Sequence, residues 1–121
     1  MNIEIEKGNL FDSKAGAIIL TVDGASKGME GNIARAFGRL YPDAWEELEY
    51  DIEYPIPLGS AKIYPIDPDL GCTNSHCIIA STLNHIDVLE DREKLEVISQ
   101  ALRASLSLAA NRGISTVCTG V

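Results

Sequence analysis

Short apolar segments of strand length alternate along this chain with segments of helical periodicity, and this alternation restricts the fold more than any other feature. Residues 15–22 are mostly apolar, which is typical of a strand covered on both faces. Further strands are predicted at residues 2–6, 60–66, 77–83 and 114–118. Strands that alternate with helices predict an α/β fold with a mixed, mostly parallel central sheet flanked by helices.

Helices are predicted between these strands from apolar residues spaced three or four apart. The first has an apolar face made of Met29, Ile33, Phe37 and Leu40. The second begins at Pro42, and its stripe is Trp45, Leu48 and Ile52. The third and longest has the stripe Leu95, Ile98, Leu102, Leu106 and Ala109. Asp87 and Glu90 have capping-box spacing before the third helix, and Gly113 is placed to end it.

The chain is acidic. Ten Lys and Arg residues against eighteen Asp and Glu residues give a net charge of −8. No basic residue occurs between Arg39 and Lys62, whereas acidic residues are frequent there. This stretch predicts a solvated helix face, with a docking surface for a basic partner as the alternative. Because no basic face is available for phosphates, we expect no nucleic-acid partner.

The sequence predicts neither a membrane span nor a secretory leader. The apolar run 17–20 is too short to cross a bilayer, and residues 1–7 lack a basic segment followed by an apolar one. We therefore expect a cytoplasmic protein with no membrane partner. The cysteines are an odd number, which predicts reduced thiols: Cys72, Cys77 and Cys118. His76 lies close to two of them, but no second pair of zinc ligands follows, and we expect neither a metal nor a cofactor.

Ligands of α/β folds bind at the carboxyl ends of strands, where loops lead into helices. This rule selects two segments, residues 23–28 and residues 119–121. The loop at 24–31 contains three glycines, which let the backbone approach a ligand closely, and N–H groups of the following helix can hold an anion. The loop matches neither GxGxxG nor GxxxxGK[ST], so an ordinary strand-to-helix turn is the alternative.

Segments along the whole chain, taken in order, match one known pattern. Gly8-Asn9-Leu10, the strand at 17–19, the glycine loop and residues 33–38 are followed by residues 58–61, 101–110 and 114–121. Together they resemble the macro domain family. The resemblance implies a three-layer α/β fold that binds ADP-ribose or a related nucleotide diphosphate, in some members with hydrolysis of ADP-ribosyl bonds. It implies these ligand-binding residues: Asn9, Leu10, Asp23, Gly28, Met29, Gly31, Thr119, Gly120 and Val121.

Some differences from the family pattern bear on function. Asn9 stands where the family has an Asp that accepts from the adenine amino group, and residues 20–23 contain no Asn where the family has Asn-Ala-Ala-Asn. The family continues with another strand and helix, so we expect residues 1–121 to form one macro-like domain that lacks them. Without that strand Ile3 and Ile5 lie on an open sheet edge, which predicts a homo-oligomer.

Two residues each have two interpretations. Asp23, the one candidate catalytic group, either contacts a ribose or an activated water, or forms an Asx turn before Gly24. His85 is either a general base or a hydrogen-bonded loop residue. No Ser/His/Asp or Cys/His triad can be assembled from the sequence. We expect a nucleotide-binding module rather than an enzyme; the alternatives are a degenerate structural or oligomerising domain and an ADP-ribosyl hydrolase.

Overall fold

In the computed structural model, which describes residues 15–25, 31–86 and 88–119, four strands form one mixed sheet in the order β2-β3-β1-β4. The strands are β1 (Ala17–Asp23), β2 (Ala61–Pro65), β3 (His76–Leu83) and β4 (Val117–Thr119). β1 pairs in parallel with both β3 and β4, while β2 runs antiparallel to β3. The predicted mixed, mostly parallel sheet is confirmed. The strand predicted at 2–6 lies outside the described residues.

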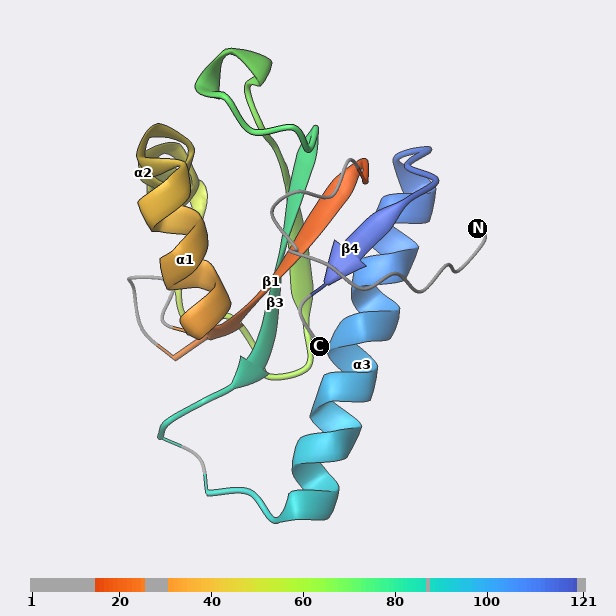
Figure 1. Ribbon diagram of the computed structural model, residues 1–121. Coiled ribbons are helices and arrows are strands. Elements are labelled where there is room, and N and C mark those ends of the chain that lie inside the picture. The colour runs from red at the N-terminus through yellow and green to blue at the C-terminus, as the bar shows by residue number, and fades with distance from the viewer. Residues whose placement is uncertain (1–14, 26–30, 87, 120–121) are drawn as a thin grey trace.

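Helices cover both faces of the sheet (Figure 1). α1 (Asn32–Leu40) and α2 (Pro42–Asp51) lie on one face, and α3 (Asp91–Asn111) lies on the other. Ile18, Leu20 and Val22 of β1 belong to the core under α1 and α2, whereas Ala17 and Ile19 belong to the core under α3. The strand is covered on both faces, which explains its nearly continuous apolar sequence. The predicted three-layer α/β fold is confirmed.

The ends of two strands follow from local chemistry. Pro65 has no N–H to donate, and β2 lies at one end of the strand order, as its proline predicts. β4 begins at Val117 rather than at residue 114, so the predicted bounds 114–118 are wrong. Gly113, with a φ of 71°, turns the chain, and the Ile114 N–H donates to the Ala109 carbonyl of α3 at 2.9 Å. Residue 114 therefore completes the helix cap before the strand can start.

The buried faces of α1 and α3 differ from the predicted stripes. In α1 the buried residues are Ala34 and Phe37, whereas Leu40 is 55% exposed. In α3 the buried residues are Ala101, Ser105 and Ala109. The larger Leu95, Ile98 and Leu102 are exposed. Only the second half of α3 lies over the sheet, so Leu95 and Ile98 in the first half have no strand to pack on, and small side chains bring the second half close to the sheet.

The N-terminal cap of α3 also differs from the prediction. Glu90 and Glu93 form a reciprocal capping box, in which the Glu90 N–H donates to Oε1 of Glu93 at 3.4 Å. The predicted pair of Asp87 and Glu90 is therefore wrong by one turn, and Asp87 itself lies outside the described residues. Across the described ranges, no helix combines the length and apolar character needed to cross a membrane.

Candidate functional site

The carboxyl ends of β1 and β3 meet at one edge of the sheet because the two strands are parallel neighbours. Asp23 ends β1 and lies opposite Leu83, after an irregularity in the register between Val22 and Asp23. Asn84 and His85 follow β3 directly. This register brings together two residues that are 62 positions apart in the sequence, Asp23 and His85.

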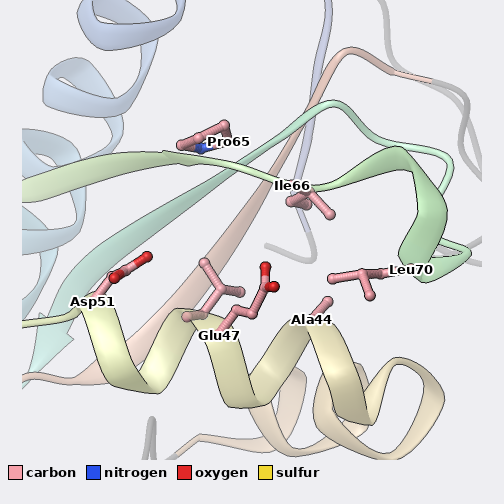
Figure 2. A pocket seen from close by; sticks show the side chains of 7 residues that line it. Ala44, Glu47, Asp51, Pro65, Ile66 and Leu70 are labelled. Atoms are coloured by element: carbon pink, nitrogen blue, oxygen red, sulfur yellow. The ribbon is translucent and has the colours of Figure 1, made fainter.

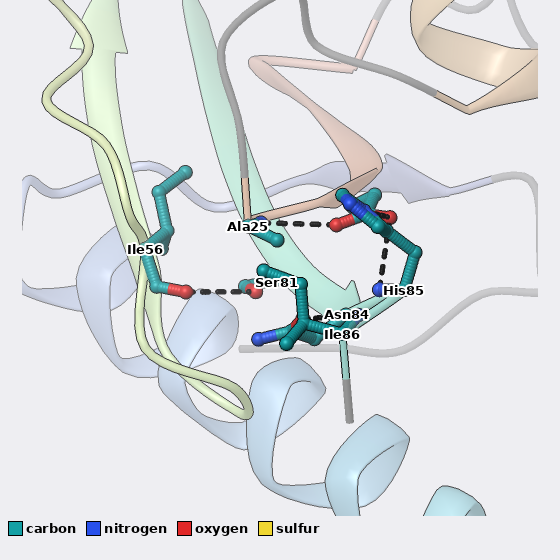
Figure 3. A network of polar contacts seen from close by, with 7 residues as sticks. Ala25, Ile56, Ser81, Asn84, His85 and Ile86 are labelled. Carbon is teal, nitrogen blue, oxygen red and sulfur yellow. Dashed lines mark hydrogen bonds and ion pairs between the residues drawn. The ribbon is translucent and has the colours of Figure 1, made fainter. Parts of the chain in front are cut away.

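Asp23 is enclosed, with only 6% of the residue exposed. Both of its carboxylate oxygens accept hydrogen bonds, and the donors Ala25 and His85 are labelled in Figure 3. Its Oδ1 accepts from the Ala25 N–H at 2.9 Å. Its Oδ2 accepts from the His85 backbone N–H at 3.1 Å and lies 2.8 Å from His85 Nδ1. Asp23 thus makes the hydrogen bond of an Asx turn, and His85 is a hydrogen-bonded loop residue; neither bond pattern excludes a role toward a ligand.

The charge on Asp23 fixes the proton position on His85. Burial acts to raise the pKa of Asp23, but the hydrogen bonds from Ala25 and His85 outweigh it and hold that pKa below its ordinary value. Asp23 is therefore a carboxylate at neutral pH and can only accept hydrogen bonds. Nδ1 of His85 must carry the proton, which leaves the lone pair of the neutral ring on Nε2. The His85 side chain is 56% exposed, so the ring is accessible.

Rigid backbone contacts hold this pair. The Gly24 N–H donates to the Leu83 carbonyl at 3.0 Å, and the Gly24 carbonyl accepts from the Ile56 N–H at 2.7 Å. A side chain at Gly24 would collide with the Ser81 hydroxyl, which itself donates to the Ile56 carbonyl at 3.2 Å. Hydrogen bonds and close packing next to Asp23 therefore join three parts of the chain: the end of β1, the end of β3 and the segment before β2.

The N-terminus of α1 lies at the same edge of the sheet. Gly31, which precedes the helix, has a φ of 151°, and a Cβ there would lie 2.8 Å from the Thr21 carbonyl oxygen. Only glycine permits this close approach to β1. No side chain among the described residues caps the helix, and the N–H groups at a helix start can hold an anion at the positive end of the helix dipole.

The structure brings together some of the predicted site residues. Asp23 and Gly31 lie at one edge, whereas Thr119 pairs with Ile19, four residues before Asp23. At about 3.3 Å per residue, Thr119 lies roughly 13 Å from Asp23 along the strand direction. The Thr119 hydroxyl oxygen is enclosed, and no residue within the described part of the chain bonds to it. The remaining predicted residues lie outside the described ranges: Asn9, Leu10, Gly28, Met29, Gly120 and Val121.

Solved structures share this fold, although no protein-family model and no curated protein matches the sequence. The macrodomain of Mycobacterium tuberculosis DarG is 21% identical with a TM-score of 0.68, over 93% of this chain and 70% of that one. The macrodomain of Thermus aquaticus DarG is 18% identical with a TM-score of 0.70, and the match covers 92% of this chain and 70% of that one. A Thermosipho africanus DarTG structure in complex with ADP-ribose is 16% identical with a TM-score of 0.65, and the match covers 91% of this chain and 30% of that one. The chain has the macrodomain fold.

The pairing of Asp23 with His85 is the feature of this macrodomain fold that sequence reasoning missed. The sequence alone does not pair the two residues, because the contact depends on β1 and β3 being parallel neighbours. A signal was present: each residue follows closely on a buried apolar run. Assuming that these two runs pair in parallel would have predicted the contact.

The cysteines near His76 do not form a metal site. Cys77 is buried in β3, where burial raises the pKa of its thiol well above the usual range. Cys72 is also buried, and its Sγ donates to Oδ1 of Asn74 at 3.6 Å. Within the described ranges, no three His, Cys, Asp or Glu residues are grouped as metal ligands.

A small cleft lies at the opposite edge of the sheet, between α2 and the segment after β2 (Figure 2). That segment includes the 3₁₀ helix η2 (Pro68–Leu70). The cleft has a volume of about 20 Å³, enough for roughly one water molecule. Glu47 and Asp51 line it with carboxylates, which repel an anionic nucleotide. The acidic face of α2 is exposed, in agreement with the predicted solvated helix face.

Proposed function

We propose that this chain binds ADP-ribose or a related nucleoside diphosphate at the carboxyl edge of its sheet. The observation that carries the proposal is the uncapped start of α1, held against β1 by Gly31 and placed at the same edge as the buried Asp23 carboxylate. Backbone N–H groups at a helix start bind phosphate oxygens. The fold supports the proposal because one structure that shares it, Thermosipho africanus DarTG, was solved in complex with ADP-ribose.

The acidity of the chain is compatible with this ligand. Oriented backbone amides hold anions without requiring net positive charge on the protein, so a net charge of −8 does not prevent binding. The acidic residues of α2 line the opposite edge of the sheet, away from Asp23 and the start of α1. The diphosphate would therefore approach the start of α1 and not the acidic face of α2.

Isothermal titration calorimetry with ADP-ribose tests the proposal. We expect saturable binding with one ligand per chain. Gly28→Val, in the segment joining β1 to α1, should weaken affinity by at least about tenfold, or about 1.4 kcal/mol, because a branched side chain then occupies the path of the phosphates. Ser107→Val, at an exposed position of α3, serves as the control. No heat of binding from folded wild-type protein would contradict the proposal.

The Asp23–His85 pair favours a second candidate function, hydrolysis of a bond on the bound nucleotide. With Nδ1 held by the carboxylate, Nε2 is the accessible proton acceptor. In this reaction Nε2 accepts a proton from water while the water oxygen attacks an ester carbonyl carbon. The bond between the carbonyl carbon and the ribose oxygen then breaks, and Nε2 gives its proton to the departing ribose oxygen. Asp23 stabilises the transient imidazolium.

Turnover of an acetyl ester of ADP-ribose tests this second function. His85→Gln should lower kcat about 100-fold or more, because general-base catalysis contributes factors of this size, while ADP-ribose affinity is retained. His76→Gln, at the other histidine, should leave kcat unchanged. Binding without turnover in the wild type would refute hydrolysis and leave nucleotide binding intact.

A further inference from the structure

Exposed large apolar side chains concentrate in one stretch of the chain. Of the eight such residues in the described ranges, six lie between residues 83 and 102: Leu83, Ile86, Val88, Leu95, Ile98 and Leu102. The other two, Leu40 and Tyr50, belong to α1 and α2. Single exposed apolar residues are normal on a protein surface, but a concentration like this one marks an interaction site.

The first half of α3 extends past the end of the sheet (Figure 1), and none of residues 91–100 is buried. Leu95, Ile98 and Leu102 are spaced three and four apart, which places them on one face of the helix. We name these three residues the α3 stripe. Leu95 is 69% exposed. The spacing is that of the contact seam between two packed helices.

Charge indicates which partner fits the α3 stripe. Residues 91–103 contain three acidic side chains, Asp91, Glu93 and Glu96, and three basic ones, Arg92, Lys94 and Arg103, so this segment is neutral. The whole chain has a net charge of −8. A strongly basic partner is attracted to the acidic face of α2 instead. A second copy of this chain meets electrostatic repulsion over most of its surface but not along this half of α3.

We infer that the α3 stripe binds the α3 stripe of a second copy, with the two helices antiparallel about a twofold axis. In such an isologous contact both copies contribute the same patch. Because this segment is neutral and carries charges of both signs, two copies of it can meet without net repulsion. Ile86 and Val88, in the segment before α3, are also exposed. This inference is independent of nucleotide binding, and it differs from association through the edge at Ile3 and Ile5.

Sedimentation equilibrium over about 1–100 µM protein tests the inference, a range in which micromolar association is detected. The wild type should be a reversible dimer. Leu95→Glu with Ile98→Glu should raise the dissociation constant at least about tenfold, because the mutations place charges in an apolar seam. Both residues are exposed in the single chain, so circular dichroism should report unchanged folding. The matched control, Leu40→Glu on α1, replaces another exposed leucine and should leave association unchanged.

Three results would overturn the inference. The first is a wild type that stays monomeric throughout this concentration range. The second is a dimer that Leu40→Glu weakens as much as the double variant does. The third is a dimer that Ile3→Lys with Ile5→Lys dissociates while the α3 variant leaves it intact, since association then uses the sheet edge.

Discussion

Asp23 shows how one carboxylate can both close a turn and orient a neighbouring side chain. Its Oδ1 satisfies the Ala25 N–H, and its Oδ2 satisfies the backbone N–H and the ring of His85. A carboxylate that is 6% exposed needs such partners, because an unpaired buried charge is strongly unfavourable. The same bonds orient His85 and select the ring nitrogen that faces the solvent.

Asp23→Asn should lower the free energy of unfolding at pH 7 by about 1–3 kcal/mol, because an amide cannot accept from all three donors. The pKa of Asp23 is lowered in the folded state. Its stabilising contribution is therefore present above the unfolded carboxyl value of about 4 and is lost as the pH falls through the folded value. Urea denaturation at pH 7 and at about pH 3 should show the wild type and the variant converging in acid.

Asp67→Asn is the matched control for this experiment. Asp67 also accepts from a backbone N–H two residues ahead, that of Asp69 at 2.9 Å, but it is exposed. Its replacement should change stability less at pH 7, because the side chain is exposed to water. Equal losses for both variants at every pH would mean that Asp23 acts through its turn alone.

At the scale of elements, α1 and α2 are joined at a tight corner. A Cβ at Gly38 would lie 2.6 Å from Cε3 and 2.7 Å from Cδ2 of Trp45, so the indole ring packs directly on the α1 backbone. Tyr41 connects the two helices, and its ring centroid lies 5.3 Å from that of Phe37. Gly38 is therefore a packing residue inside α1.

Gly38→Ala should therefore destabilise the protein, by about 1–3 kcal/mol from overpacking, although alanine alone favours a helix by about 1 kcal/mol over glycine. Thermal unfolding and the Trp45 fluorescence spectrum measure the effect. In a Trp45→Leu background Gly38→Ala should be neutral or stabilising, because the indole ring that would collide with the new Cβ is absent. A stabilised single variant would contradict direct packing of the indole on α1.

At the scale of the whole molecule, the candidate site, the acidic cleft and the exposed apolar residues of α3 lie in different places on the fold. The carboxyl edge holds Asp23, His85 and the start of α1, and the opposite edge holds the acidic cleft. α3 covers the sheet with its second half and presents an apolar stripe with its first half. Association through that stripe would place two candidate sites in one particle.

Dimerisation should make the melting temperature depend on protein concentration, because only the folded state binds the second copy. We expect a melting temperature that rises with concentration between about 1 and 100 µM for the wild type and stays constant for Leu95→Glu with Ile98→Glu. Differential scanning fluorimetry at matched buffer conditions is sufficient. A wild-type melting temperature that does not move with concentration would argue against a dimer of this kind.

The sequence by itself determined the order and type of the elements. The apolar run before Asp23 and the proline in β2 predicted a buried strand and an edge strand because burial on both faces and a missing N–H act locally. The exposed acidic face of α2 and the helix end at Gly113 followed for the same reason. These features depend on residues that are close together in the chain.

Only the tertiary structure decided which helix faces are buried and which distant residues meet. The periodicity of α3 identifies a helix, but only the packing of the whole chain places its second half, with the buried Ala101 and Ser105, over the sheet and leaves Leu95 and Ile98 beyond it. The contact of Asp23 with His85 requires β1 and β3 to be parallel neighbours in one register. That register is set by packing between segments far apart in the chain, which local patterns do not encode.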